Sequence, residues 1–326
     1  MILDLLTFAA SFLIALILYP VAIDMLRHVK SGQVIQAELP ESHQKKAGTP
    51  TGGGILFAAL GIAGGLVAAV NAHAGAWPAV AGLVAGGLIG FADDQSKLRI
   101  GSRGIPARLK LPIQLLLALP VAYIALSASS GPCGGPSLMM CDGPHQYLLP
   151  FEPWLLFPLA VVAIVATANA VNITDGIDGL AGGLSAIALA AMVLLLRGAP
   201  AGEKAVAMTL AGALVAFLVF NRHPARVFMG DTGSLAIGYA LAAMAIQQGF
   251  LVLLPLLALV FVLETLSVII QVAYFKASGG RRVFKMTPIH YTFHHEGWSE
   301  NRIALSFWGA GLVSALAAAG VARLIS

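Results

Sequence analysis

Long apolar runs alternate with short polar segments along the whole chain. A helix needs about 20 apolar residues to cross the hydrocarbon layer of a membrane, and an unbroken apolar run of that length is typical of a spanning helix. Ten such segments are predicted, near residues 2–24, 53–71, 76–92, 111–128, 154–171, 180–197, 204–221, 233–248, 250–275 and 302–324. We therefore expect an all-α, polytopic integral membrane protein with about ten transmembrane helices.

The composition agrees with lipid as the main solvent of this chain. Of the 326 residues, 58% are hydrophobic and 10% are charged, and the mean hydropathy is +0.87. A soluble domain carries about 25% charged residues, so too few charges are present here to cover a globular surface. Because no polar stretch is long enough for a soluble domain, residues 1–326 are interpreted as a single transmembrane domain.

The distribution of basic residues predicts the orientation. When the loops are assigned alternately to the two sides of ten helices, all 19 lysines and arginines fall on one side except Arg197, Lys204 and Arg323. Cytoplasmic loops carry such an excess, so we expect both termini outside and the polar loops in the cytoplasm of a bacterial inner membrane. These basic residues are spread over separate loops without interleaved aromatics, and a nucleic-acid partner is therefore not expected.

The two cysteines, Cys133 and Cys141, fall in the same predicted outer loop. The outer side of a bacterial inner membrane is oxidising, which permits a disulfide there. Two free thiols explain the sequence equally well, so both states stay open.

Five aspartates lie close to the predicted cytoplasmic helix ends, in three glycine-rich loops: Asp93, Asp94, Asp175, Asp178 and Asp231. A single aspartate in such a place is usually a helix N-cap or a solvated charge, and capping alone would explain Asp231 in GDTGS. Five acids from three loops are harder to explain in this way, because acidic side chains at the bilayer are costly and mark functional sites.

This set of residues favours phosphoryl transfer. Carboxylates without a cysteine or a tight histidine set suit Mg²⁺ or Mn²⁺, and glycine turns let backbone N–H groups approach an anion. Cationic partners lie on the same predicted side, at Lys45, Lys46, Lys97, Arg103 and Lys110. A bound metal, glycine turns and lysines are the parts used for phosphoryl transfer. The sequence has no GxxxxGK[ST] run, so a P-loop is excluded.

Five motifs follow in order: HQKKAGTPTGGG (43–54), FADDQSK (91–97), NITDGIDGLAGG (172–183), NRHPARVFMGDTGS (221–234) and RRVFKMTPIHYTFHHEGWSENR (281–302). Together they resemble the polyprenyl-phosphate N-acetylhexosamine-1-phosphate transferase superfamily, and within it most closely the phospho-N-acetylmuramoyl-pentapeptide transferases. The resemblance covers essentially the whole chain. It implies Mg²⁺-dependent transfer of phospho-MurNAc-pentapeptide from UDP-MurNAc-pentapeptide to undecaprenyl phosphate. The products are lipid I and UMP, in the first membrane step of peptidoglycan synthesis.

The resemblance also implies roles for individual residues. Catalytic positions are matched by Asp93, Asp94, Asp231 and His290, and magnesium ligands by Asp231 and Asn172. Substrate-binding positions are matched by Lys46, Thr51, Lys97, Asn172, Asp175, Asp178, Asn221, Phe228 and Gln271. Among these, Asn221 and Phe228 match positions that hold the uracil ring.

The chain departs from the family pattern in two motifs. Gly52 stands where the family usually has methionine, and three consecutive family histidines appear here as His290-Tyr291-Thr292. The roles of His294 and His295, slightly later in the chain, stay open. His223 is interpreted as a hydrogen-bonding or solvated histidine.

Two other functions compete with this interpretation. A sister enzyme would use UDP-GlcNAc, and the segment around His290 favours the pentapeptide enzyme although it is the segment that deviates. A secondary transporter would place charged groups near the bilayer midplane, often within an inverted repeat. The acids gather instead at one face, no repeat is found, and only Glu264 fits a transporter.

Further questions stay open at this stage. The ninth segment could bend at Pro255 to form a groove for the polyprenyl chain, or it could be an ordinary span with Glu264 pointing into the bundle. The sequence does not choose between one-step transfer and a covalent intermediate. It also leaves open whether the chain forms a homodimer.

Overall fold

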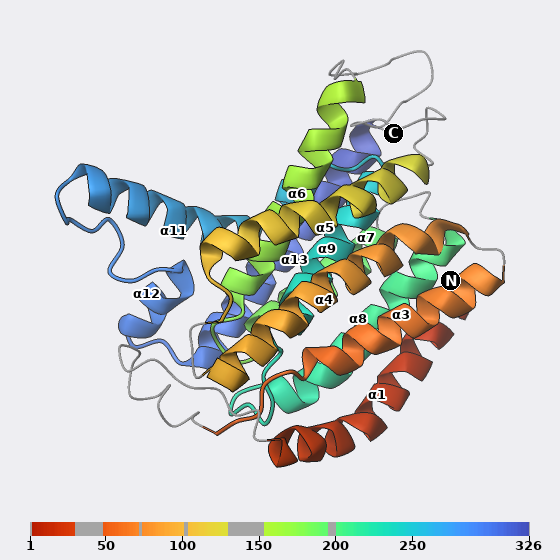
Figure 1. Ribbon diagram of the computed structural model, residues 1–326, viewed down its shortest axis with the longest axis horizontal. Helices are drawn as coiled ribbons and strands as arrows, with labels where there is room; N and C mark the ends of the chain where they lie inside the picture. The colour runs from red at the N-terminus through yellow and green to blue at the C-terminus, as the bar shows by residue number, and fades with distance from the viewer. Residues whose placement is uncertain are drawn as a thin grey trace.

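The computed structural model describes residues 2–29, 48–71, 74–100, 104–129, 153–194 and 200–325, which form helices and no strand. Each of the ten predicted segments contains a helix (Figure 1). The helices are α1 (Ile2–His28), α3 (Gly54–Val70), α4 (Trp77–Ile100), α5 (Ala107–Ser127), α6 (Pro153–Thr174), α7 (Leu180–Leu194), α8 (Ala201–Asn221), α9 (Gly230–Gln247), α10 (Leu254–Leu257), α11 (Leu259–Ala277), α12 (Ile289–His295) and α13 (Glu300–Ile325), with a short 3-10 turn η1 (Ala74–Ala76).

Six of these helices are long and apolar enough to cross a membrane: α1, α5, α6, α8, α11 and α13. Two shorter apolar helices, α3 and the first fourteen residues of α7 (Leu180–Val193), accompany them. The predicted all-α, multi-pass membrane architecture is therefore confirmed. The predicted disulfide alternatives at Cys133 and Cys141 lie outside the described residues.

Helix α4 packs closely against α9 through a row of glycines. Gly82, Gly86 and Gly90 recur every four residues, and a Cβ added to any of them would come within 2.9 Å of the α9 backbone. At Gly90 it would lie only 2.2 Å from the carbonyl oxygen of Asp231. Small residues at this spacing let membrane helices approach closely. The row therefore brings the acidic end of α4 against the first turn of α9.

Two helix boundaries differ from the predicted ones. Helix α4 continues to Ile100, so Asp93, Asp94 and Lys97 lie in its last turns and not in a loop. Helix α5 begins at Ala107, four residues before the predicted apolar start, which puts Lys110 in its first turn. An apolar run marks only the part of a helix that lies in lipid. The helix itself can continue beyond that run, because polar residues at its end also form backbone hydrogen bonds.

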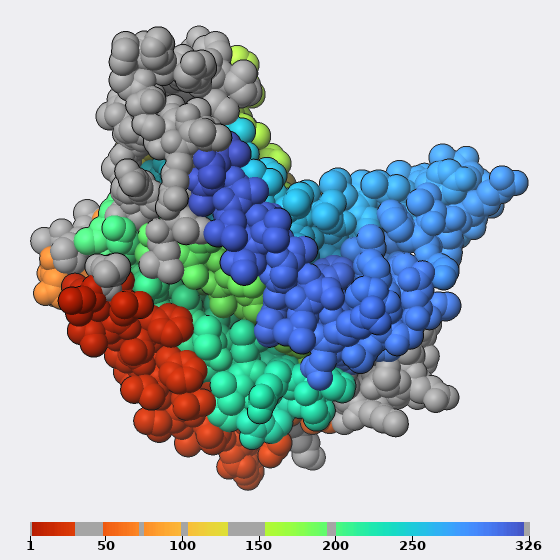
Figure 2. Space-filling model, turned by 180° about the vertical axis from the view of Figure 1, so that it is seen from behind, coloured from red at the N-terminus to blue at the C-terminus, as the bar shows by residue number. Residues whose placement is uncertain are grey.

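The ninth segment is broken. Helix α10 contains Pro255 in its first turn, the backbone leaves helical geometry at Ala258, and α11 then leads away from the bundle (Figures 1 and 2). The break therefore follows three residues after the predicted bend. Glu264, on α11, is fully buried beside α12, as the alternative prediction required for this side chain.

Candidate active site

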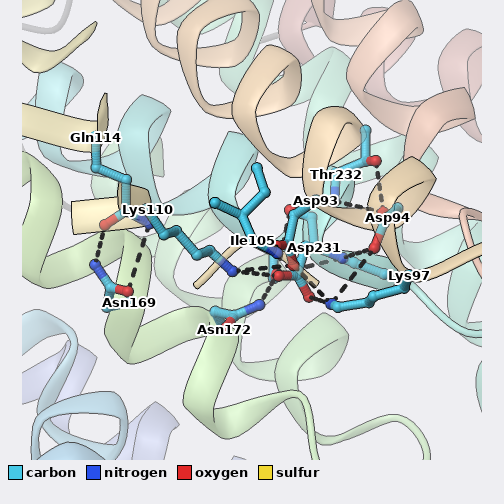
Figure 3. A network of polar contacts seen from close by, with 12 residues as sticks. Asp93, Asp94, Lys97, Ile105, Lys110, Gln114, Asn169, Asn172, Asp231 and Thr232 are labelled. Carbon is cyan, nitrogen blue, oxygen red and sulfur yellow. Dashed lines mark hydrogen bonds and ion pairs between the residues drawn. The ribbon is translucent and has the colours of Figure 1, made fainter. Parts of the chain in front are cut away.

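Two lysines and two aspartates from three helices form the centre of an acid–lysine cluster (Figure 3). Lys97 Nζ on α4 lies 2.8 Å from Asp93 Oδ2 and 2.8 Å from Asp231 Oδ1. Lys110 Nζ on α5 donates to Asp231 Oδ2 and lies 3.3 Å from Asp93 Oδ2. Asp93 is only 2% exposed. Each lysine therefore joins α4 to the start of α9 through a pair of ionic contacts.

The carboxylate of Asp94 caps α9 from outside that helix. Its Oδ1 accepts the backbone N–H of Asp231 at 3.0 Å, and its Oδ2 accepts the N–H and the hydroxyl of Thr232 at 2.9 and 2.7 Å. The local N-cap residue, Met229, provides no side-chain hydrogen bond. The alternative that Asp231 acts as the N-cap is therefore wrong, because Asp94 satisfies the first-turn N–H groups.

Gly230 leaves the space that the Asp94 carboxylate needs to reach the start of α9. Its φ is +75°, a left-handed conformation that favours glycine, and an added Cβ would lie 2.8 Å from Asp94 Oδ2 and 3.0 Å from Thr51 Oγ1. Thr51 therefore lies beside the cap, at the edge of the cluster. The backbone around it is joined to the segment before α9, since the N–H of Phe228 donates to Pro50 O at 2.9 Å.

The charges in the cluster shift one another's ionisation. Burial by itself lowers the pKa of Lys97, but the adjacent carboxylates of Asp231 and Asp93 outweigh burial and raise that pKa above its usual range. Burial by itself raises the pKa of Asp231, but the contact with Asp93 and the charges of Lys110 and Lys97 outweigh burial and hold that pKa well below its usual range. Asp231 is therefore an ionised carboxylate at neutral pH.

Asp175 lies in the turn between α6 and α7. Burial, followed by the negative charges of Asp231, Asp94 and Asp178, raises the pKa of Asp175 to about 7, although Lys97 opposes the shift. The turn therefore places a fourth carboxyl group within electrostatic reach of the cluster.

The raised pKa of Asp175 predicts a pH-dependent stability. Without divalent cations, we expect the contribution of Asp175 to stability to be complete below pH 3.8 and to be lost as the pH rises to about 7. The sign follows because the folded state binds this proton more tightly than the unfolded state. In thermal melts across this range, Asp175→Asn should lack that decline, whereas Asp24→Asn on exposed α1 should keep it. Superimposable profiles for wild type and Asp175→Asn would contradict the expectation.

Asp178 belongs to a second cluster. His223 Nδ1 lies 2.9 Å from Asp178 Oδ2, which also accepts the N–H of Ala225 at 3.0 Å. The N–H of Asp178 donates to Glu300 Oε2 at 3.1 Å. The potential ligand atoms of Asp178, His223 and Glu300 lie within 4.8 Å of one another, so this group could hold a metal ion. The interpretation of His223 as a hydrogen-bonding residue is confirmed.

The two predicted asparagines connect elements around the clusters. Asn172 Nδ2, at the end of α6, donates to Ser234 Oγ on α9 at 2.9 Å, which places Asn172 beside the first turn of α9. Asn221 Oδ1 accepts the N–H of Gly179 at 2.9 Å, and its Nδ2 donates to Val227 O at 2.9 Å. Asn221 therefore holds the loop after α6 against the segment that contains half-buried Phe228.

Other predicted site residues have different surroundings. Gln271 Oε1, on α11, accepts the N–H groups of Val283 and Phe284 at 3.0 and 2.9 Å. His290 is 0% exposed, and its partner is the carboxylate of Glu264. Lys46 lies outside the described residues.

Sequence reasoning did not place Lys110 among the site residues. The sequence indicates Lys110 only as one of five cationic partners on the cytoplasmic side, and the resemblance assigns it no role because it lies outside the five motifs. Its position at the start of an apolar run, facing the acidic end of another helix, was the available signal.

The acid–lysine cluster has the charge and the donor atoms for a divalent cation. Its ionisable groups in the described residues are four carboxyls and two ammonium groups, namely Asp93, Asp94, Asp175 and Asp231 with Lys97 and Lys110. When all are ionised, two negative charges remain unbalanced, and this excess adds to the effect of burial in raising the pKa of Asp175. Carboxylate oxygens are the ligands that Mg²⁺ prefers. The residues therefore fit a bound divalent cation.

Comparisons with known proteins agree with this chemistry. The family model of glycosyl transferase family 4 matches residues 76–249. A phospho-N-acetylmuramoyl-pentapeptide-transferase of Heliobacterium modesticaldum is 42% identical over 309 residues, covering 93% of this chain and 92% of the relative. Proteins of the same name from Geobacillus kaustophilus and Bacillus cytotoxicus are 42% and 43% identical over 321 residues each. These alignments cover 94% and 96% of this chain, and 94% and 95% of the respective relatives.

The matched region runs from α4 to the end of α9 and so contains the acid–lysine cluster. The full-length relatives extend the similarity over nearly the whole chain. The chain therefore belongs to the phospho-N-acetylmuramoyl-pentapeptide-transferase family.

Proposed function

We propose that this protein transfers phospho-MurNAc-pentapeptide from UDP-MurNAc-pentapeptide to undecaprenyl phosphate, which yields lipid I and UMP. The observation that carries the proposal is the pair of lysines, Lys97 and Lys110, held between carboxylates at one end of the helix bundle. Both substrates present phosphate groups, and two ammonium groups on neighbouring helices can bind them together. The names of the full-length relatives support the choice of sugar and lipid.

The main barrier to this reaction is electrostatic. Two unit charges about 4 Å apart repel by roughly 4 kcal/mol at an effective dielectric constant near 20, and several such pairs arise between a lipid phosphate and a diphosphate. We propose that Lys97 and Lys110 turn from their carboxylates toward the phosphates and reduce this repulsion. We further propose that Asp231 and Asn172 hold Mg²⁺, which when bound neutralises charge on the diphosphate.

The attacking group needs little help from a base. A phosphate monoester has a second pKa of about 6, so the lipid phosphate is largely dianionic near neutral pH. We propose that Asp93, which lies beside Lys97 and Lys110 at the centre of the cluster, accepts the remaining proton. Both oxygens of Asp93 already have partners, since Oδ1 accepts the N–H of Ile105 at 2.7 Å. This arrangement favours direct attack by the lipid phosphate over a covalent aspartyl intermediate.

We propose that the ten long helices all cross the bacterial inner membrane, with both termini outside and the acid–lysine cluster facing the cytoplasm. The one-sided distribution of lysine and arginine supports this orientation.

The polyprenyl chain needs an apolar path to the cluster. A cavity of about 720 Å³ lies between α4 and α5, lined from Trp77 to Leu88 on one helix and from Leu117 to Ala128 on the other. Lys97 follows the lining residue Leu88 by nine residues on α4, and Lys110 precedes the lining residue Leu117 by seven residues on α5. We propose that this cavity holds part of the polyprenyl chain, in addition to the predicted groove along the ninth segment.

Release of UMP from purified protein tests the proposed function. With undecaprenyl phosphate and Mg²⁺, UDP-MurNAc-pentapeptide should release UMP and UDP-GlcNAc should release little. Chelation of the metal should stop the reaction. A preference for UDP-GlcNAc would assign the chain to the sister activity, and absence of UMP with both nucleotides would contradict transfer altogether. A transporter would release no UMP, and the gathering of the acids at one end of the bundle argues against that function.

A further inference from the structure

A buried pair of ionisable side chains lies outside the acid–lysine cluster. Glu264, in the second turn of α11, and His290, in the first turn of α12, are both 0% exposed. His290 Nδ1 lies 3.1 Å from Glu264 Oε2, and the backbone N–H of His290 approaches the same oxygen at 3.4 Å. Burying a carboxylate is costly without a compensating partner, so the two groups depend on each other.

The other edge of the imidazole faces the turn that carries Asp175. A Cβ added at Gly176 would lie 2.4 Å from His290 Nε2, so only a glycine leaves room for the ring. The neighbouring Tyr291 donates its hydroxyl to Gly176 O at 3.0 Å, and its ring lies 4.2 Å from the His290 ring centre. His290 is thus enclosed between Glu264 on one side and the Asp175 turn on the other.

We infer that Glu264 is a positioning residue for the phosphotransfer reaction, acting through His290 on the Asp175–Gly176 turn. The inference rests on the proposed function. The carboxylate beside Nδ1 favours the tautomer that carries its hydrogen there, because the partner of one ring nitrogen sets the protonation of the other. Nε2 is then the unprotonated nitrogen, which packs against Gly176 without a hydrogen-bond partner among the described residues. The ring orientation is therefore determined by the Glu264 carboxylate on one side and by packing against the turn on the other.

This arrangement links the projecting helix to the acid–lysine cluster. Helix α11 leads away from the bundle after the break at Ala258 (Figure 2). Glu264 lies near the start of α11. The contact of Glu264 with His290 therefore anchors the base of α11 to the turn whose carboxyl group interacts with Asp231. A shift of that turn by about 1 Å is enough to reduce turnover by roughly a hundredfold in a preorganised site.

Steady-state kinetics of Glu264→Gln test the role. This variant keeps the side-chain shape, and we expect kcat to fall about 10- to 100-fold while KM for UDP-MurNAc-pentapeptide stays within about threefold. Glu203→Gln is the matched control, because Glu203 is also 0% exposed but lies in the first turn of α8, about 27 Å along that helix from Asn221. Glu203→Gln should retain turnover within about threefold. Equal losses in both variants, or a loss only in KM, would overturn the inference.

A double variant separates positioning through His290 from an independent effect. Glu264→Gln combined with His290→Gln should lose no more turnover than His290→Gln alone, because the two residues act as one unit. Losses that multiply would overturn the inference. If Glu264→Gln does not fold, Glu264→Asp provides the same comparison with the charge retained and the carboxylate withdrawn from His290.

Nitrogen NMR of the substrate-free protein gives a readout that does not depend on turnover. In ¹⁵N-histidine-labelled protein, the ring signals missing from His290→Gln identify His290. We expect Glu264→Gln to move those signals toward the other tautomer and Glu203→Gln to leave them in place. Unchanged His290 signals in Glu264→Gln would refute the positioning role. Failure of the wild type to release UMP would instead refute the proposed function, so the two failures are distinguishable.

Discussion

Asp231→Asn should give a folded, membrane-inserted protein whose release of UMP is reduced about a hundredfold or more. The change removes a full negative charge from between Lys97 and Lys110, and a neutral amide oxygen is a poor replacement for a carboxylate ligand of Mg²⁺. The start of α9 should be undisturbed, because Asp94 caps it through the backbone N–H of residue 231, which asparagine retains. Initial rates across a magnesium titration, together with a thermal melt, measure both parts of this expectation.

Asp24→Asn is the control for Asp231→Asn. The side chain of Asp24 is 71% exposed on α1, so the same chemical change there should leave turnover intact. If Asp231→Asn retains a rate within a few-fold of wild type at limiting Mg²⁺, its assignment as a metal ligand is wrong.

Lys110→Gln should also reduce turnover by about a hundredfold, since it removes a charge placed to stabilise the transferring phosphate. In the resting protein, the substitution leaves Lys97 as the only described ammonium group between the carboxylates of Asp93 and Asp231. Their mutual repulsion should therefore lower the melting temperature, and added Mg²⁺ should recover part of that loss. Rates of UMP release and melts with and without Mg²⁺ are the measurements.

Arg108→Gln provides the comparison on the same helix. Arg108 is exposed and lies two residues before Lys110, so its substitution removes an equal charge from the same turn of α5 without touching the carboxylates. Similar losses in both variants would attribute the effect to the overall charge of the cytoplasmic face, and would remove Lys110 from the site.

The helical segments and the type of chemistry were readable from the sequence. Apolar length alone predicts a membrane helix, because each helix satisfies its own backbone and the lipid imposes a minimum span. The aspartate and glycine motifs likewise indicated phosphoryl transfer, because carboxylates that can hold a metal, glycine turns and lysines are together the parts used for that chemistry. The row of Gly82, Gly86 and Gly90 was also visible, but its spacing does not say which helix it faces.

Only the tertiary structure decided which polar groups meet. Asp94 and Asp231 are 137 residues apart in the chain, and Lys110 and Asp231 are 121 residues apart. No local pattern relates such positions. Asp94, and not Asp231, caps α9 because α4 packs closely against the start of that helix. The burial of His290 against Glu264 follows from the break before α11. Local residue preferences determine helices, whereas contacts between helices depend on how their faces pack, and the site is built from those contacts.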